Sequence, residues 1–176
     1  MKKLCWIDIE TTGLDPNTDM ILEICACITD ERGNDDESIP FYMATGGLCE
    51  RAEELLAKNA FVTEMHHQSG LLWDMEQRGD QPLDLAEFWA WAEEHARGTH
   101  LAGFSVHFDR SFLMPRAGEI FHHRIVDMSS IEIALLAAGF ESPRGDKRPA
   151  HRAPADVRAA QHAYWKALWA LERRAS

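Results

Sequence analysis

Hydrophobic and polar residues alternate over three segments in the first quarter of the chain. The alternation predicts strands at Leu4–Glu10, Met20–Thr29 and Ile39–Ala44, because the side chains of a strand point in turn to its two faces. The connections between them, TGLDPNTD and DERGNDDE, are rich in the glycine, aspartate, asparagine and proline that form turns. The second connection is short, so we expect the two strands that it joins to pair antiparallel.

The apolar spacing becomes helical from residue 50 onward, with apolar residues recurring every three or four positions. We expect helices at Glu50–Asn59, Ser69–Gln77, Pro82–Ala96, Asp109–Leu113, Ile131–Ala138 and Pro154–Arg173, and short strands at Thr99–Phe104 and Arg124–Asp127. Three strands followed by alternating helices and strands predict an α/β fold with a mixed central sheet flanked by helices. The length of 176 residues fits one domain, residues 1–176.

Composition excludes some classes of protein. No run of about 18 apolar residues occurs, so no membrane-spanning segment is expected. The N-terminus lacks the apolar stretch of a secretory signal. The four cysteines form no CxxC pair, and three of them lie in apolar runs, which is typical of reduced thiols in a cytoplasmic protein. We therefore expect a cytoplasmic protein with no membrane partner.

The charge of the chain limits how it can meet nucleic acid. Acidic residues outnumber basic ones by 29 to 18, which gives a formal net charge of −11. A protein that grips long nucleic acid by its phosphates needs a basic surface, so the charge argues against that class. It remains compatible with an enzyme that recruits cations to act on a short anionic substrate.

Two carboxylates interrupt the first predicted strand, in the stretch CWIDIETTGLDP. Residues two apart on a strand share a face, so Asp8 and Glu10 project together, about 7 Å apart. Two neighbouring anions repel and raise each other's pKa unless a cation lies between them. A solvent-facing strand would also tolerate such a pair, but the flanking Trp6, Ile7 and Ile9 favour a strand that is covered on at least one side.

Two further segments place polar side chains at the beginning of helices. In HRAPADVRAAQHAYW, Pro154 favours the first helical turn, which leaves His151 in the preceding loop and Asp156 in the first turn, where both can address one site. In LAGFSVHFDRSFLMP, Asp109 opens a helix after a short strand. The simpler interpretation is that both aspartates only complement a helix dipole and that His151 is an ordinary loop residue.

Together these segments resemble the DEDD-type 3′-to-5′ exonucleases of the ribonuclease H-like fold, in the subgroup with a catalytic histidine, and within it the oligoribonucleases. The resemblance rests on five motifs in the family's order: WIDIETTGLDP near the start, MHHQSGL at Met65–Leu71, FDRSFL at Phe108–Leu113, FHHRIVDMSS at Phe121–Ser130 and HRAPAD at His151–Asp156. The first and last motifs occur across the wider group, whereas MHxxSGL and RxxDxSS are specific to the oligoribonucleases.

This resemblance implies a catalytic role for five residues. Asp8, Glu10, Asp109 and Asp156 would hold two Mg²⁺ or Mn²⁺ ions, because these hard cations prefer oxygen ligands. The ions would orient the attacking water and stabilise charge on the phosphate and the leaving oxygen. His151 would be the general base, a task suited to a residue type that titrates near neutrality. The expected reaction is the 3′-to-5′ hydrolysis of short single-stranded RNA to nucleoside 5′-monophosphates.

The resemblance also implies substrate contacts. Leu14 matches the leucine that wedges between two bases in the family, although a turn leucine that caps the core is a close alternative. His66, Ser105, Arg124 and Ser129 match positions that contact the 5′-terminal phosphate and so confine the family to very short RNA.

Two residues depart from the family near this phosphate cap. Phe104 stands where the family usually has asparagine, and Glu132 stands where it often has lysine, which reverses a charge. We therefore expect a preference for dinucleotides that is shallower than the family's, with the metal chemistry unchanged.

Other functions stay open at this point. A DNA proofreading or trimming exonuclease of the same superfamily would share the five catalytic residues, and the MHxxSGL element and a requirement for the 2′-hydroxyl distinguish it. A non-catalytic nucleic-acid-binding or interaction module would have lost at least one of the five catalytic residues, and all five are present. The resemblance further implies a homodimer, and the tryptophans Trp89, Trp91, Trp165 and Trp169 could supply either core or interface.

Overall fold

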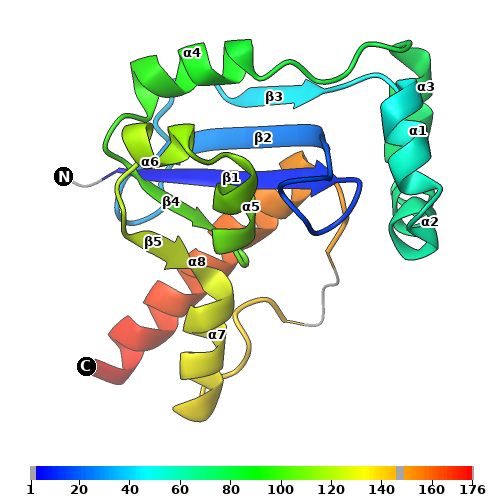
Figure 1. The fold of residues 1–176 in the computed structure, drawn as a ribbon. Coiled ribbons are helices and arrows are strands. Elements are labelled where there is room, and N and C mark those ends of the chain that lie inside the picture. Colours follow the sequence, from blue (N-terminus) through cyan, green and yellow to red (C-terminus); the bar gives the residue numbers. More distant parts are fainter. Residues whose placement is uncertain (1–2, 146–148, 176) are drawn as a thin grey trace.

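A mixed sheet built around β1 organises the molecule. The computed structural model describes residues 3–145 and 149–175. In these residues the strands are β1 (Leu4–Thr11), β2 (Ile21–Thr29), β3 (Tyr42–Thr45), β4 (His100–Gly103) and β5 (Ile125–Asp127), and they lie in the order β3-β2-β1-β4-β5 (Figure 1). β1 pairs antiparallel with β2 and parallel with β4, while β3 pairs antiparallel with β2 and β5 parallel with β4. The predicted mixed sheet and the antiparallel pairing of β2 with β3 are therefore confirmed.

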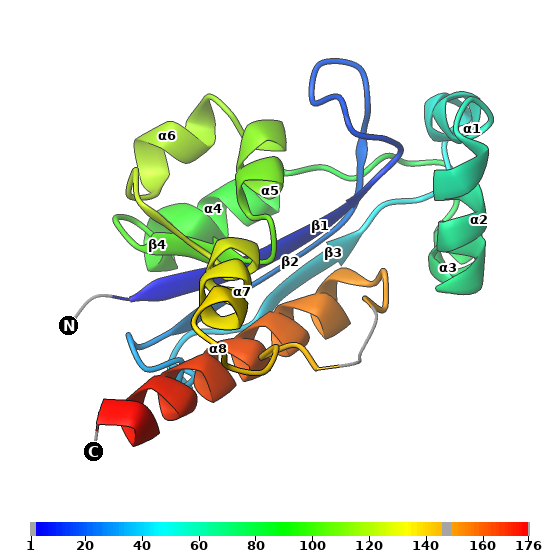
Figure 2. The ribbon, with the colours of Figure 1, turned by 90° about the horizontal axis from the view of Figure 1, so that it is seen from below.

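Helices cover both faces and one end of this sheet. Within the described residues they are α1 (Glu50–Leu56), α2 (Ala60–Gln68), α3 (Leu71–Gln77), α4 (Ala86–His95), α5 (His107–Phe112), α6 (Arg116–Ile120), α7 (Met128–Ala137) and α8 (Ala153–Ala175). Figure 2 shows α8 lying along one face of the sheet, with α4, α5 and α6 on the opposite face and α1–α3 grouped at one end.

The alternation along β1 sends its side chains into two separate cores. Cys5, Ile7 and Ile9 pack with α4, α5 and α6, whereas Leu4 and Trp6 pack with α7 and α8. A third core joins Leu22 of β2 to α1, α2 and α3. Because the period of a strand is two, the face that carries Leu4 and Trp6 under α8 continues to Asp8 and Glu10.

Several element boundaries differ from the sequence prediction. The pattern does not predict α2, because Asn59 was assigned to the end of α1, whereas its side chain accepts the backbone N–H of Val62 and so begins a new helix. The five-residue helix α6 was not predicted either. β3 begins at Tyr42 rather than Ile39, since Pro40 has no N–H to give to the sheet.

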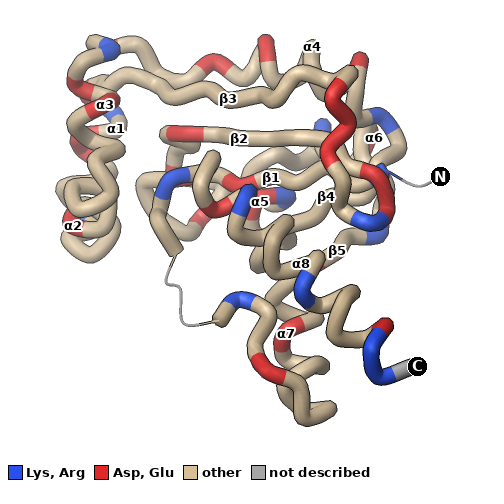
Figure 3. Tube along the Cα trace, turned by 180° about the vertical axis from the view of Figure 1, so that it is seen from behind, with Lys and Arg blue, Asp and Glu red and all other residues tan. Residues whose placement is uncertain are grey.

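The distribution of acidic residues agrees with the negative net charge of the sequence. Acidic residues are spread over the whole trace (Figure 3). In the described part of the chain, no helix has both the length and the apolar character needed to cross a bilayer. All four cysteines are free.

The tryptophans divide between the interior and the surface. Trp89 and Trp91 of α4 belong to the core, whereas Trp165 and Trp169 of α8 are 50% and 59% exposed. The first pair therefore cannot form an interface.

Candidate active site

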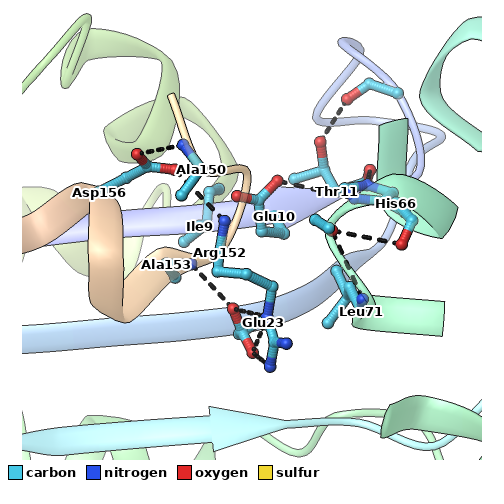
Figure 4. Close-up of polar contacts among 12 residues, drawn as sticks. Ile9, Glu10, Thr11, Glu23, His66, Leu71, Ala150, Arg152, Ala153 and Asp156 are labelled. Atoms are coloured by element: carbon cyan, nitrogen blue, oxygen red, sulfur yellow. Dashed lines mark hydrogen bonds and ion pairs between the residues drawn. The ribbon is translucent and has the colours of Figure 1, made fainter. Parts of the chain in front are cut away.

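Three carboxylates meet where β1 passes the first turn of α8. Asp8 and Glu10 leave β1 on the face that α8 covers, and Asp156 lies in the first turn of α8. One carboxylate oxygen from each lies within 4.8 Å of the other two. The prediction that Asp8 and Glu10 share a face is confirmed, and Figure 4 shows Glu10 and Asp156 lying close together above the sheet.

Burial and mutual repulsion make the ionised form of this group unfavourable. Burial raises the pKa of Asp8 well above its ordinary value, and the charges of Asp109, Glu10 and Asp156 raise it further. Burial, followed by repulsion from Asp156, raises the pKa of Glu10 to about 8, while Arg152 lowers it slightly. Only a cation can relieve this repulsion while leaving all three groups ionised, so the donor set fits hard divalent ions that prefer oxygen.

Asp109 stands beside the three-carboxylate group without joining it. This residue lies in the first turn of α5 and is 3% exposed. Its Oδ1 accepts the backbone N–H of Ile9 at 3.0 Å. Burial raises the pKa of Asp109 to about 7 even though this hydrogen bond opposes the shift. Since its charge also acts on Asp8, Asp109 remains available as a fourth carboxylate at the end of β1.

His151 lies in the loop before α8, as the position of Pro154 predicts. With Asp8, Glu10 and Asp156 it lines a pocket of about 660 Å³. Its φ is +53°, in the left-handed region that costs energy for any residue with a β-carbon. A conformation of this kind persists only where the surrounding contacts impose it, so the residues on either side of His151 must hold the loop.

An ion-pair clamp that the sequence does not reveal supplies those contacts. The guanidinium of Arg152 lies 2.9 Å from Glu23 of β2 and 2.6 Å from Asp74 of α3. Glu23 is fully buried, and it also accepts the backbone N–H of Ala153 at 2.8 Å and the hydroxyl of Thr45 at 3.0 Å. Figure 4 shows Arg152 reaching down from the loop to Glu23. The one possible signal in the sequence is a lone carboxylate within the apolar run ILEICACIT.

Asp156 holds the same loop from the other side. Its two carboxylate oxygens accept the backbone N–H groups of Ala150 at 2.9 Å and Arg152 at 3.3 Å. The loop is thus fixed to β2 and α3 through Arg152 and to α8 through Asp156, with His151 between the two attachments.

His66 is placed differently from the expected contact with a substrate phosphate. The ring is fully buried, and its Nε2–H donates to the carbonyl oxygen of Thr11 at 2.9 Å. Its Nδ1 lies 3.8 Å from Glu10 Oε2 and has no hydrogen-bond partner among the described residues. Burial lowers the pKa of His66, which disfavours the charged form of the ring. A ring in this position offers no surface to a phosphate, and it packs beside Glu10 without a hydrogen bond to it.

Two of the other expected substrate contacts come together. The backbone N–H of Ser105 donates to Ser129 Oγ at 3.1 Å, and the two hydroxyl oxygens lie 3.0 Å apart. Asp127 organises both residues, since its Oδ1 accepts the backbone N–H groups of Ser129 at 2.8 Å and Ser105 at 3.3 Å. Asp127 was missed in the sequence, where an aspartate directly before a helix that opens with serines is the signal of an N-cap.

Leu14 and Arg124 lie at the surface. Leu14 is 77% exposed in the turn after β1, so the alternative that it caps the core is wrong. Arg124 precedes β5 and is exposed, and its backbone bonds to the rings of His100 and His122. The structure does not show its side chain on Ser105 or Ser129, and its contact with substrate stays a prediction.

The raised pKa values predict how the stability of the metal-free protein depends on pH. Glu10 titrates at 4.5 in an unfolded chain and at about 8 in the folded one. Its contribution is thus intact below pH 4.5 and is lost as the pH rises to 8, because folding then opposes ionisation. We expect the free energy of unfolding, measured by urea denaturation in EDTA, to fall over this range, and Glu10→Gln to reduce that fall. Glu76→Gln, at an exposed position of α3, is the matched control. A slope that Glu10→Gln leaves unchanged would contradict the assignment.

Removing the ion pairs of Arg152 should lower the free energy of unfolding. Arg152→Ala leaves Glu23 buried without its cation, and we expect a loss of about 3 kcal/mol in the free energy of unfolding. Adding Glu23→Gln should restore part of it, because no uncompensated charge then remains in the interior. Arg51→Ala removes the exposed pair with Glu54 and should cost less than about 1 kcal/mol. Equal losses in the two arginine variants would mean that the clamp adds nothing to stability.

Comparison with known proteins places this site in a family. A family model described as Exonuclease matches residues 5–164. The oligoribonuclease of Corynebacterium glutamicum (strain R) is 36% identical over 170 residues, which cover 88% of this chain and 73% of the relative. The oligoribonuclease of Tropheryma whipplei (strain Twist) is 32% identical over 161 residues, which cover 88% of this chain and 85% of the relative.

Solved structures share the fold at lower identity. An exonuclease I from Methylocaldum szegediense superposes with a TM-score of 0.61 at 22% identity, and the Escherichia coli exonuclease I in a complex with single-stranded DNA superposes with 0.62 at 16%. Each match covers 99% of this chain, which spans 42% and 41% of the two exonuclease I chains. The predicted ribonuclease H-like architecture is thereby confirmed. With its three carboxylates and His151 in one pocket, this chain belongs to the exonuclease family and is a relative of the oligoribonucleases.

Proposed function

We propose that this chain is a 3′-to-5′ exonuclease that hydrolyses short single-stranded RNA to nucleoside 5′-monophosphates. The observation that carries the proposal is the group of three carboxylates, with ligand oxygens within 4.8 Å of one another, in the pocket that His151 also lines. RNA is favoured over DNA because the relatives at 32–37% identity are named oligoribonucleases.

Two divalent cations, Mg²⁺ or Mn²⁺, complete the proposed site. Asp8, Glu10 and Asp156 would hold them, with Asp109 as the fourth carboxylate. When bound, such ions supply positive charge that orients a water molecule and stabilises charge on the phosphate and the leaving oxygen.

The side chains of the site transfer the proton and hold the general base in place. His151 takes a proton from the water whose oxygen attacks the terminal phosphorus, and the bond from phosphorus to the 3′ oxygen of the preceding nucleotide breaks. That 3′ oxygen gains a proton from solvent, and the terminal residue leaves as a nucleoside 5′-monophosphate. Arg152 and Asp156 hold His151 in its strained conformation.

The substrate-binding part of the proposal uses the remaining predicted residues. The exposed Leu14 offers an apolar surface on which a base can stack. The hydroxyls of Ser105 and Ser129, with Arg124, would contact the 5′ phosphate. We also propose a cytoplasmic homodimer: the four free thiols suit a reducing compartment, and the exposed Trp165 and Trp169 offer apolar surface to a second copy.

Loss of a carboxylate should abolish hydrolysis. We expect Asp8→Ala or Asp156→Asn to give no measurable turnover of a 5′-labelled dinucleotide, because the site can then no longer hold its cations. Glu76→Gln, which alters an exposed carboxylate of α3 outside the group and outside the clamp, should retain hydrolysis. The same assay on matched deoxynucleotides compares RNA with DNA through the 2′-hydroxyl. Appreciable turnover by the wild type in excess EDTA would contradict the metal-dependent mechanism.

His151→Ala should separate chemistry from binding. We expect a fall in turnover of about 10² to 10⁴, the usual contribution of a positioned general base. Affinity for divalent ions, measured by isothermal titration calorimetry, should stay near the wild-type value because His151 is not among the ligands. A rate within about threefold of wild type would show that His151 is only a loop residue.

A further inference from the structure

The pocket that begins at the three carboxylates ends between α8 and the segment around Arg144. Four of its lining residues lie on one face of α8, at positions i, i+4, i+7 and i+11, and all four are exposed: Ala155, Ala159, His162 and Lys166. The two small alanines leave space next to Asp156. His162 and Lys166 lie further along the helix, about 16 Å from Ala155 at the far end, which is more than one nucleotide requires.

Arg144 faces this helix from the opposite side of the pocket. Its guanidinium carbon lies 3.6 Å from the centroid of the Phe104 ring, and Glu132 lies 3.8 Å from its Nε. Glu132 also accepts a hydrogen bond from the hydroxyl of Ser142, which fixes the segment that carries Arg144. The two residues that depart from the family pattern, Phe104 and Glu132, therefore act together to hold one arginine at the pocket.

The positive charges of Arg144 and Lys166 have few negatively charged partners within the described part of the chain. His162 and Lys166 make no ion pair with any described carboxylate, and the terminal nitrogens of Arg144 have no described acceptor. Arg158, another lining residue, is paired with Asp35 at 2.7 Å. In a protein of net charge −11, a lysine without an ion pair and an arginine whose terminal nitrogens are left without acceptors favour an anionic ligand at a pocket. We call Arg144 and Lys166, together with the imidazole of His162 as a hydrogen-bonding group, the cationic wall.

We propose that the cationic wall binds the phosphates of substrate nucleotides beyond the one being cleaved, so that the site holds single strands longer than a dinucleotide. This inference rests on the proposed exonuclease function. The stacked guanidinium of Arg144 presents its edge to a phosphate, with which it can form two hydrogen bonds. Lys166 adds a second positive charge further along α8, where Figure 3 shows basic residues recurring. The wall adds nothing to the binding of a dinucleotide, whose phosphates lie at the carboxylates and at the predicted contacts Ser105, Ser129 and Arg124.

Binding measurements on variants test the wall. Each variant is made in a His151→Ala background, so that labelled RNA of two or five nucleotides binds without turnover and is followed by fluorescence anisotropy. We expect Arg144→Ala and Lys166→Ala to raise the Kd for the pentanucleotide about 5- to 10-fold and the Kd for the dinucleotide less than twofold. Each should also lower the salt dependence of pentanucleotide binding, by about 0.7 in the slope of log Kd against log salt concentration.

Two controls make the result specific. Lys58→Ala removes an exposed lysine outside the pocket and should change neither Kd. Arg144→Lys keeps the charge but loses the planar fork, and should fall between wild type and Arg144→Ala. Pentanucleotide affinities equal to that of Lys58→Ala would overturn the wall. Hydrolysis by the protein with His151 intact reports separately on the proposed function: RNA that is bound but never cleaved would overturn that function and leave the wall standing.

Discussion

The repulsion among carboxylates at the end of β1 is the constraint on which the rest of the site depends. Burial raises the pKa of Asp8 well above its ordinary value, and nearby negative charges add to the shift. A group of this kind is tolerated only where something else stabilises the fold around it. Here β1 runs through the centre of the sheet, paired on both edges and covered by helices on both faces, so its backbone cannot move to separate the charges. Rigidity of the central strand thus makes the site unfavourable without a cation and ready to accept one.

The protein handles two buried acids of neighbouring strands in opposite ways. Glu10 and Glu23 face each other across β1 and β2. Glu23 is neutralised within the protein, by Arg152 and the backbone N–H of Ala153. Glu10 has no such ion pair: the ring of His66 lies 3.8 Å away, beyond a hydrogen bond, and Arg152 only lowers its pKa against the larger effects of burial and of the neighbouring carboxylates. One carboxylate is therefore used to anchor the loop that carries His151, and the other is left able to accept a cation.

The sequence predicts those features of the fold and the site that depend on residues close together in the chain. The shared face of Asp8 and Glu10 is a property of any strand, and the separation of His151 from Asp156 follows from one proline, so both predictions hold. The clamp joins Glu23, Asp74 and Arg152, residues up to 129 positions apart, and no local pattern encodes such a meeting. His66 lies in a motif that resemblance assigns to substrate, yet the packing of α2 against the end of β1 buries its ring. Burial of a single side chain depends on the whole fold, which is why the sequence did not reveal that this ring is covered.

Net charge is a poor guide to the field inside this pocket. The sum of −11 is spread over a surface where acidic residues occur on almost every element, and solvent screens most of them from the site within about 10 Å. Inside the pocket both signs of charge occur, since Asp8, Glu10 and Asp156 line it together with Arg144 and Lys166. A phosphate is attracted by Arg144 and Lys166, and it can approach the carboxylates only when cations are bound there, because bare carboxylates repel it. The field that an anionic ligand meets in this pocket therefore depends on the part of the pocket that it reaches and on the cations bound there, and the sum of charges over the chain does not predict it.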